Sequence, residues 1–426
     1  MRQCDTVDPI KISNRYHKVN QCRICGSKDL IQFLDLGEMP LANRYLSSND
    51  LDQEEPRFPL QILFCRSCAL SQLSMVVDPK ILYHHYDYHS SVSKTFQEHC
   101  EAMASSLAHD LELSENDLVL EIASNDGCLL SKFQNLGCKI LGIEPAKNLA
   151  QLAEKMGLPT FNRFWEPSIA EQVLKSHGRP KLIVATNVLA HVDNIHNFIR
   201  TVASLLTKDG AFVFEVPYMV NFINRAEFDT TYHEHLSYFL LRPLKRVLEA
   251  NGLVLIDVHE FEIHGGSVRV MARPSQNFSG PASENVQRLL DWEEELGLYD
   301  EATYFRFAAH IALLKEELST FLRALKARGK KLAAYGASAK GNVLLNYCGL
   351  GKDVLDYVVD DTHAKQGKIY PGNHLPIVSR THLHEAPPHY LLLLAWNFVD
   401  ELVKNTSDFH AQGGRYIVPI PSLRVI

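Results

Sequence analysis

The densest group of reactive side chains in this sequence is the segment Thr231-Tyr232-His233-Glu234-His235. A histidine can take up and return a proton near neutral pH when a carboxylate or a hydroxyl orients it, and this segment supplies both. A metal site needs its ligands on one face, which a His-x-His pair offers only on a strand, and no matching third ligand is evident. We therefore interpret the segment as acid–base machinery, with metal binding and structural histidines as alternatives.

Four of the nine cysteines form two Cys-x-x-Cys pairs, Cys22 with Cys25 and Cys65 with Cys68. Two such pairs can present four thiolates to one tetrahedral Zn²⁺. Four protein ligands leave no open position on the metal, so the predicted site is structural, with free thiols or a redox pair as alternatives. The other five cysteines are scattered, a pattern typical of a reducing compartment.

A second polar group lies in the segment Val119-Leu-Glu121-Ile-Ala-Ser-Asn-Asp126-Gly127, directly after a short apolar run. The loop after the first strand of an α/β sheet usually borders the cofactor crevice. The two carboxylates of this loop would repel a dinucleotide pyrophosphate but not the cationic sulfonium of S-adenosylmethionine. Glu144 follows about 20 residues later, where a carboxylate can accept hydrogen bonds from ribose hydroxyls. These residues predict S-adenosylmethionine as cofactor, against a generic turn with solvated acids.

The segment Tyr335-Gly-Ala-Ser338-Ala-Lys340-Gly-Asn342 also joins a predicted strand to a predicted helix, but it carries a lysine and no acid. Backbone amides at a helix N-terminus together with a lysine suit a diphosphate, so a nucleotide-linked substrate is expected. The spacing is not that of a Walker A motif, and a glycine-rich packing turn is the alternative.

Tyrosines and histidines crowd residues 83–89, followed by Ser90 and Ser93. This density indicates either an aromatic edge that packs two domains together or a surface that faces the substrate.

Hydrophobic patterning divides the 426 residues into three units. Residues 1–80 are expected to form the zinc-binding module. From Leu118 onwards, short apolar runs alternate with amphipathic helices, which predicts an α/β domain with a mainly parallel sheet over residues 81–275. Helical spacing between Ser283 and Arg328, followed by further short apolar runs, predicts a helical linker and a smaller α/β domain over residues 276–426.

The overall composition excludes some partners. A formal net charge of −7 and a pI near 6.3 offer no long-range attraction for nucleic acid or anionic lipid. No apolar run approaches membrane-spanning length and the start lacks a signal-peptide pattern, so a cytoplasmic protein without a membrane partner is expected. No heptad pattern or exposed apolar face predicts an oligomer, and a monomer is compatible with the sequence.

Taken together, these motifs resemble those of S-adenosylmethionine-dependent nucleotide-sugar C-methyltransferases, which act on TDP-4-keto-deoxysugars, and the resemblance runs over nearly the whole chain. Besides the cysteine pairs and the segments at 119–127, 232–235 and 335–342, its motifs are Ser90-Ser91-Val-Ser-Lys-Thr-Phe, Gly142-Ile-Glu144-Pro-Ala, His264-Gly265-Gly266-Ser267, Asp360-Asp361, Lys365-Gln-Gly and Tyr370-Pro371-Gly372. The resemblance implies a central Rossmann-like class I methyltransferase domain and a C-terminal Rossmann-like domain that binds the sugar nucleotide.

The resemblance also implies a reaction in deoxysugar biosynthesis: a carbon next to the ketone, usually C3, loses its proton, and the enolate attacks the methyl of S-adenosylmethionine. His235 would be the general base, with Glu234 and Tyr232 orienting it or handling the enolate oxygen. Tyr86 and His191 would lie near the sugar. The implied cofactor-binding residues are Glu121, Ala123, Asn125, Asp126, Gly127, Glu144, Pro145 and Asn187. The implied substrate-binding residues are Ser90, Ser93, His264, Gly265, Gly266, Tyr335, Ser338, Lys340, Asn342 and Asp360.

Two positions depart from the methyltransferase pattern. Ala123 stands where many methyltransferases carry glycine, and Arg163 follows Asn162 in the region near the adenine. Neither departure removes a reacting group. Two other functions remain as alternatives: an NAD-dependent sugar-nucleotide oxidoreductase, and a zinc-ribbon adaptor whose methyltransferase-like domain does not catalyse.

Overall fold

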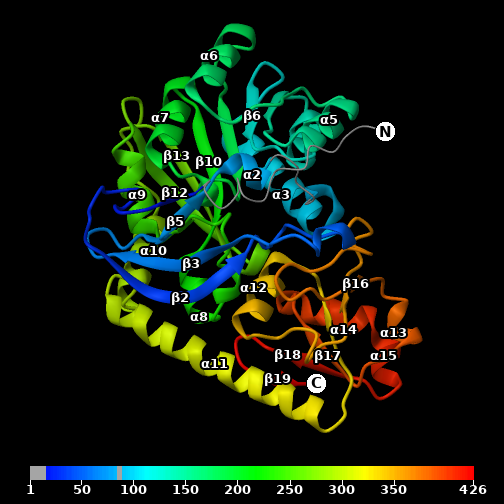
Figure 1. Ribbon diagram of the computed structural model, residues 1–426. Coiled ribbons are helices and arrows are strands. Elements are labelled where there is room, and N and C mark those ends of the chain that lie inside the picture. Colours follow the sequence, from blue (N-terminus) through cyan, green and yellow to red (C-terminus); the bar gives the residue numbers. More distant parts are fainter. Residues whose placement is uncertain (1–15, 84–88) are drawn as a thin grey trace.

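The structure, a computed structural model, describes residues 16–83 and 89–426. The zinc-binding module, blue in Figure 1, is built on the long antiparallel pair β2 and β3. Its sheet has the order β11-β4-β3-β2, so β11, which directly follows the Tyr232–His235 segment, completes the sheet of the first unit. The strands of this part are β1 (Tyr16–Lys18), β2 (Leu30–Pro40), β3 (Arg57–Cys65), β4 (Ser71–Leu73), β5 (Met75–Val77) and β11 (Ser237–Tyr238).

The central unit contains a seven-stranded sheet with the order β12-β13-β10-β9-β6-β7-β8. Strands β10, β9, β6, β7 and β8 are parallel, and β13 runs antiparallel to both of its neighbours. The strands are β6 (Leu118–Ile122), β7 (Lys139–Ile143), β8 (Thr160–Phe161), β9 (Leu182–Thr186), β10 (Ala211–Pro217), β12 (Leu253–Phe261) and β13 (Ser267–Pro274). This confirms the predicted mainly parallel sheet, whose central strands are apolar because helices cover both faces.

Helices connect and cover these strands. Helix α4 begins directly after the loop that follows β6, and α5 begins after the loop that follows β7, so both loops open at the carboxyl edge of the sheet. The helices of this unit are α2 (Pro79–Tyr83), α3 (Lys94–Asp110), α4 (Cys128–Asn135), α5 (Lys147–Lys155), α6 (Pro167–Ser176), α7 (Ile195–Leu205), α8 (Met219–Asn224) and α9 (Leu241–Glu249).

The C-terminal unit contains a six-stranded sheet with the order β16-β15-β14-β17-β18-β19, parallel except for β19. Its strands are β14 (Leu332–Tyr335), β15 (Val358–Val359), β16 (Ile377–Val378), β17 (Tyr390–Leu393), β18 (Arg415–Val418) and β19 (Arg424–Val425). Its helices are α12 (Ala339–Tyr347), α13 (His382–Glu385), α14 (Val399–Asn405) and α15 (Ser407–Ala411). The predicted second α/β domain is therefore present.

The predicted helical linker forms two helices, α10 (Glu284–Glu295) and α11 (Glu301–Ala327). In Figure 1, α11 runs along the molecule from the zinc-binding module to the C-terminal unit. The ring of Tyr304 on α11 packs against Phe33 and Phe64 of the module, with ring centroids 4.9 and 4.4 Å apart. Farther along, Ile311, Leu314, Leu318 and Leu322 are buried at helical spacing. The linker thus ties the two end units together through its apolar stripe.

Among the helices of residues 16–83 and 89–426, none combines the length and the apolar character that crossing a membrane requires.

Candidate active site

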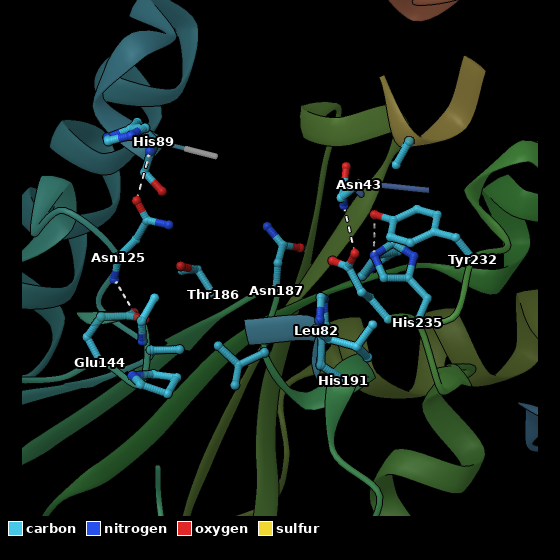
Figure 2. Close-up of a pocket in the computed structure, with 18 of the residues that line it drawn as sticks. Asn43, Leu82, His89, Asn125, Glu144, Thr186, Asn187, His191, Tyr232 and His235 are labelled. Atoms are coloured by element: carbon cyan, nitrogen blue, oxygen red, sulfur yellow. Dashed lines mark hydrogen bonds between the residues drawn. The ribbon is translucent and has the colours of Figure 1, made fainter. Parts of the chain in front are cut away.

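A large pocket, with a volume of about 1460 Å³, lies where the three units meet. Its walls come from residues 41–45 of the zinc-binding module, from the carboxyl ends of β6, β7 and β9, and from parts of residues 338–340, 362–368 and 395–402 of the C-terminal unit. Figure 2 shows Asn125 and Glu144 on one side, Tyr232 and His235 on the other, and Asn187 between them. The pocket therefore lies at the sheet edge where α/β folds bind ligands.

The loop after β6 is shaped by an unusual backbone. Ala123 and Asn125 have φ angles of 54° and 53°, and Gly127 has a φ of 82°. A Cβ atom on Gly127 would lie 2.2 Å from Leu158 Cδ1, so a side chain at this position would force Leu158 to move. The left-handed conformation of Ala123 explains why glycine, which adopts it without strain, is common at this position in other methyltransferases.

Glu144, at the end of β7, is fixed by this loop. Its carboxylate accepts hydrogen bonds from the backbone amides of Asn125 and Ala146, at 2.8 and 2.7 Å. Burial raises the pKa of Glu144 to about 7, although the two amides act in the opposite direction. Each carboxylate oxygen has a second lone pair, so Glu144 can still accept hydroxyl donors from a ribose.

The two acids of the β6 loop have different positions. Glu121 lines the pocket with only 3% of its surface exposed, and its Oε2 atom has no hydrogen-bond partner among the described residues. Burial raises the pKa of Glu121 well above its usual value. Asp126 points away from the pocket, where its carboxylate accepts hydrogen bonds from the amide and hydroxyl of Ser91 at 3.0 and 2.6 Å. Asp126 therefore holds the loop, while Glu121 faces the ligand space.

Asn187 follows β9 with a φ of 56°, and its backbone amide donates to the carbonyl of Glu215 at 2.9 Å. The side-chain oxygen of Asn187 is buried in the pocket wall without a hydrogen-bond partner in the described chain. The carboxylate of Glu215 is in turn held by His99 and Arg269, at 2.9 and 2.7 Å. This buried charge network lies directly behind Asn187 and was not predicted from the sequence.

Tyr232 and His235 form a hydrogen-bonded pair in the pocket. The phenol of Tyr232 lies 2.7 Å from Nε2 of His235, and Nδ1 of His235 lies 2.9 Å from the carbonyl oxygen of Thr230. A carbonyl can only accept, so Nδ1 of His235 carries a proton. In the neutral imidazole, the lone pair therefore lies on Nε2, which accepts the hydrogen bond from Tyr232. The chain thus selects the tautomer whose Nε2 can act as a base.

Two neighbours complete this group. The side-chain amide of Asn43, from the zinc-binding module, donates to Oε1 of Glu234 at 2.7 Å. The ring of His191 lies 5.0 Å from that of His235, and burial lowers the pKa of His191 to about 4. His191 is therefore neutral at pH 7. All four predicted catalytic residues that the structure describes line the same pocket, namely Tyr232, Glu234, His235 and His191.

His233 has a different role from its neighbours. Its ring is 2% exposed, does not line the pocket, and packs edge-on against Phe58 with centroids 5.7 Å apart. Burial lowers the pKa of His233 to about 4, so it stays neutral inside the core. His233 and His235 thus do not converge on one metal ion, and His233 matches the structural-histidine alternative.

The substrate residues implied by the resemblance lie in two environments. Ser90, Ser93, Ser338 and Lys340 line the pocket. Tyr335 donates to Asp361 at 2.7 Å, Asn342 donates to the Pro371 carbonyl at 2.8 Å, and Asp360 lies 3.6 Å from Lys365, so these three support the C-terminal fold. Gly265 and Gly266 pack against side chains of Glu227 and Asn221. Tyr86 and the side chain of His264 lie outside the described residues.

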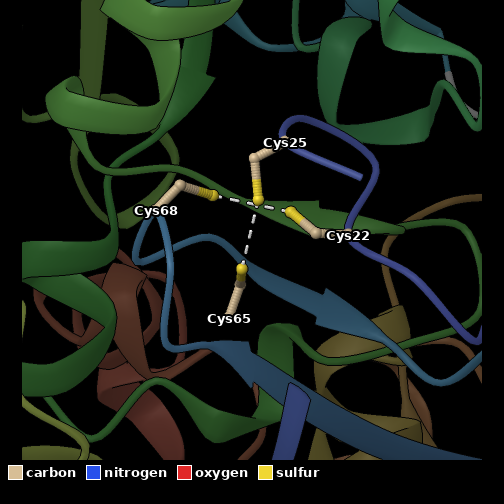
Figure 3. A group of neighbouring side chains, drawn as sticks. All are labelled: Cys22, Cys25, Cys65 and Cys68. Carbon is tan, nitrogen blue, oxygen red and sulfur yellow. Dashed lines mark hydrogen bonds between the residues drawn. The ribbon is translucent and has the colours of Figure 1, made fainter. Parts of the chain in front are cut away.

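The four cysteines of the predicted zinc site converge, as Figure 3 shows. Their sulfur atoms all lie within 4.8 Å of one another, with Cys22 to Cys68 and Cys25 to Cys65 at 3.5 Å. A tetrahedral Zn²⁺ with bonds of about 2.3 Å requires sulfurs a little under 4 Å apart, so the group fits the metal. Within the described parts of the chain, this is the one cluster of candidate metal ligands.

Family models match three successive parts of the chain: a zinc binding domain at residues 22–83, a methyltransferase domain at 96–258 and a C-methyltransferase C-terminal domain at 262–421. The C-methyltransferase NovU of Streptomyces niveus is 37% identical over 410 residues, covering 96% of this chain and 97% of NovU. The chain belongs to this C-methyltransferase family. A ubiquinone biosynthesis O-methyltransferase of Methylobacterium sp. (strain 4-46) is 24% identical over 158 residues, covering 33% of this chain and 60% of that protein.

Among solved structures, magnesium protoporphyrin IX methyltransferase from Synechocystis PCC 6803, with bound S-adenosylmethionine, has a TM-score of 0.32 and 12% identity, covering 41% of this chain and 78% of its own. The CcbJ methyltransferase from Streptomyces caelestis has a TM-score of 0.33 and 14% identity, covering 41% and 89%.

The family assignment confirms several predictions made from the sequence. This family member is an S-adenosylmethionine-dependent C-methyltransferase with an N-terminal zinc-binding module. The predicted cofactor and structural zinc are thus confirmed, and the oxidoreductase and adaptor alternatives find no support. Of the predicted cofactor residues, Glu121, Ala123, Asn125, Glu144, Pro145 and Asn187 line the pocket, whereas Asp126 and Gly127 shape the loop behind it.

A group of pocket residues from the two end units was not assigned to a site from the sequence. These are Asn43, Arg44 and Tyr45 of the zinc-binding module and Lys365 and Lys368 of the C-terminal unit. Lys365 is the first residue of the Lys365-Gln-Gly motif and Lys368 directly follows it, so this motif was the signal available for both. The zinc-binding module carried no signal for a pocket, because a short Asn-Arg-Tyr run is common on protein surfaces.

Proposed function

We propose that this C-methyltransferase methylates a carbon next to the ketone of a nucleotide-linked keto-deoxysugar, with a TDP-4-keto-deoxyhexose as substrate and C3 as the methylated carbon. The observation that supports this most strongly is that acidic and cationic side chains line the same pocket as the proton-transfer pair. Glu121 and Glu144 come from the sheet edge of the central unit, the Tyr232–His235 pair lies on the other side of the pocket from Glu144, and Arg44, Lys365 and Lys368 come from the two end units. Acidic groups suit a cationic cofactor, and cationic groups suit a diphosphate.

The proton transfer can be assigned to atoms of the chain. Nε2 of His235 takes the proton from the carbon next to the ketone, and the electron pair of that C–H bond moves toward the ketone oxygen. For this transfer the Tyr232 hydroxyl first turns its hydrogen from Nε2 to the ketone oxygen, which makes the one lone pair of Nε2 available for the proton, and the same hydroxyl then stabilises the developing enolate oxygen. The Thr230 carbonyl stabilises the imidazolium at Nδ1. S-adenosylmethionine, when bound, supplies an electrophilic methyl group.

The anion-binding wall is formed by the two end units. Leu46 and Ile369 form a two-way backbone bridge, with amide-to-carbonyl distances of 2.9 and 2.8 Å, which places Arg44 and Lys368 in the same wall. The ring of Tyr45 lies 5.4 and 6.0 Å from the ammonium groups of Lys365 and Lys368. Nη1 of Arg44 is buried without a hydrogen-bond partner in the described chain. These cations support a diphosphate at this wall.

Lys340 has a different electrostatic setting from this wall. Its ammonium lies 3.9 Å from Oε2 of Glu227, and burial raises the pKa of Glu227 to about 7. A phosphate near Lys340 would therefore also meet Glu227. We place the diphosphate nearer Arg44 and Lys368, and Lys340 nearer the sugar.

The experiment that tests this function is incubation with a TDP-4-keto-6-deoxyhexose in deuterated water, with and without S-adenosylmethionine, followed by proton NMR and mass spectrometry. Deuterium at C3 without cofactor, and a new C3 methyl with cofactor, would support the proposal. Methylation at another carbon would correct the position, and neither signal would reject the sugar substrate.

A further inference from the structure

We infer that Arg23, which stands between the zinc ligands Cys22 and Cys25, is a positioning residue for the proton-transfer segment Thr230–Leu236. The zinc-binding module then does more than stabilise the fold, because it sets the geometry of the base His235. This inference rests on the proposed role of His235 as the group that moves the proton.

The side chain of Arg23 points out of the zinc knuckle into the central unit. It is 9% exposed, and its Nη1 atom donates to the carbonyl of Leu236 at 3.2 Å and to that of Leu73 at 3.3 Å. Its Nε atom donates to Asp193 Oδ1 at 3.1 Å. The backbone amide of Arg23 donates to Oε1 of Gln72 at 2.9 Å. One guanidinium thus joins the knuckle, strand β4 and the residue directly after His235.

Leu236 is the point at which these contacts reach the catalytic group. Its amide donates to the carbonyl of Ala190 at 2.8 Å, and its carbonyl accepts from the amide of Leu73 at 3.0 Å as well as from Arg23. Ala190 precedes His191, and Leu236 follows His235. The backbone of Leu236 therefore links the residue before His191 to the residue after His235, and the imidazole rings of these two histidines lie 5.0 Å apart in the pocket.

A purely structural role does not explain why a charged side chain is buried at position 23. Burying a guanidinium is costly unless its donors find partners, and a packing position is filled more favourably by an apolar side chain. Nη1 of Arg23 reaches backbone carbonyls on two separate segments and Nε reaches Asp193, contacts that an apolar side chain cannot make, whereas Nη2 is buried without a partner among the described residues. Because the cysteines on either side of Arg23 are metal ligands, bound zinc would hold the base of this side chain rigidly.

His196 provides a matched control on the same knuckle. Its Nε2 atom lies 2.7 Å from the carbonyl of Ile24, the residue after Arg23, and its Nδ1 atom lies 2.8 Å from Nδ2 of Asn251. It thus holds the knuckle from helix α7 through a hydrogen bond similar to those of Arg23, but its partners are Ile24 and Asn251 rather than Leu236. Loss of His196 should weaken the knuckle without changing the peptide after His235.

The test compares full-length, zinc-loaded Arg23→Met, Arg23→Lys and His196→Gln with the unchanged protein. Zinc per chain, melting temperature, S-adenosylmethionine affinity and the rate of deuterium exchange into the keto-sugar without cofactor are measured for each. For Arg23→Met we expect retained zinc and cofactor affinity, little change in KM, and an exchange rate lowered about tenfold or more, because small displacements of a base are costly. Arg23→Lys, which keeps the charge and one donor nitrogen, should recover part of the rate. His196→Gln should lower the melting temperature while leaving the exchange rate within about twofold.

Equal loss of exchange in Arg23→Met and His196→Gln, in proportion to lost stability, would overturn the inference, as would an unchanged rate in Arg23→Met. If Arg23→Met does not fold, the exchange rate of Arg23→Lys is compared with that of His196→Gln by the same criteria. A readout without substrate separates this inference from the proposed function: ¹⁵N shifts of the His235 ring, assigned with His235→Asn, report its tautomer. A changed tautomer or pKa in the Arg23 variants alone supports positioning even if the sugar proves not to be the substrate, and identical shifts reject it.

Discussion

Asn43 and Glu234 are 191 residues apart in the sequence, yet the amide of Asn43 donates a 2.7 Å hydrogen bond to the carboxylate of Glu234 inside the pocket. One residue belongs to the zinc-binding module and the other to the proton-transfer segment of the central unit. The active site is therefore assembled by the first unit as well as by the methyltransferase domain.

Replacing Asn43 by alanine should lower kcat by about tenfold or more with little change in cofactor affinity. Removing a hydrogen bond to a carboxylate costs about 1.5–3 kcal/mol, and Glu234 would lose its fixed orientation beside His235. Steady-state kinetics with cofactor titration would measure this. Asn49→Ala, an exposed asparagine of the same module, is the matched control. Equal kinetics in both variants would contradict a role for this contact.

His235→Asn should abolish methyl transfer and substrate proton exchange while leaving S-adenosylmethionine binding unchanged. A general base contributes about 10²–10⁴-fold to a rate, and asparagine offers no basic nitrogen. Calorimetric titration of the cofactor and NMR of the exchange reaction check the two halves of this statement. Loss of cofactor binding together with activity would instead indicate that His235 supports the fold of the pocket.

Much of this site could be predicted from the sequence because its motifs are local. The loop after β6 and Glu144 each follow an apolar run that became a buried strand, and parallel strands bring their carboxyl ends to one edge. The zinc site could also be predicted from the two cysteine pairs, because proteins bind structural zinc with few residue types at characteristic spacings. The order of the three units could also be predicted, because the spacing of hydrophobic residues along the sequence changes from one unit to the next.

The contacts between units could not be predicted in this way. Arg23 reaches Leu236 across 213 residues, and β11 pairs with the sheet of the zinc-binding module, because tertiary packing rather than local pattern decides such pairs. The segment at 335–342 shows a related limit. Its residue types suit an anion, but Tyr335 and Asn342 donate to groups of their own unit, and only the side of the turn with Ser338 and Lys340 faces the pocket.

Cofactor affinity should fall as pH drops below 7. Burial raises the pKa of Glu144 to about 7 in the protein without cofactor, and a cationic ligand that donates hydroxyl hydrogens favours the ionised carboxylate. Binding therefore releases a proton, and affinity should decrease by up to about tenfold for each pH unit below 7. Calorimetry between pH 5.5 and 8.5, in buffers of different ionisation enthalpy, measures both effects. Glu144→Gln should bind weakly with a flatter pH profile, whereas proton uptake in the unchanged protein would contradict this role of Glu144.

Lys368→Met and Arg44→Met should each raise KM for the nucleotide-linked sugar about tenfold, because each removes one cation from the wall proposed for the diphosphate. The affinity for S-adenosylmethionine should stay the same, since the proposed cofactor residues Glu121 and Glu144 come from the central unit and not from this wall. Thymidine diphosphate alone provides a second probe, and its dissociation constant should rise in parallel with KM. The loss of affinity should be larger at low ionic strength than at high ionic strength, because salt screens the interaction.

Lys404→Met, at an exposed lysine of the same unit, controls for the loss of one positive charge from the surface. If all three variants bind thymidine diphosphate as the unchanged protein does, the diphosphate lies elsewhere in the pocket and Lys340 becomes the group to test.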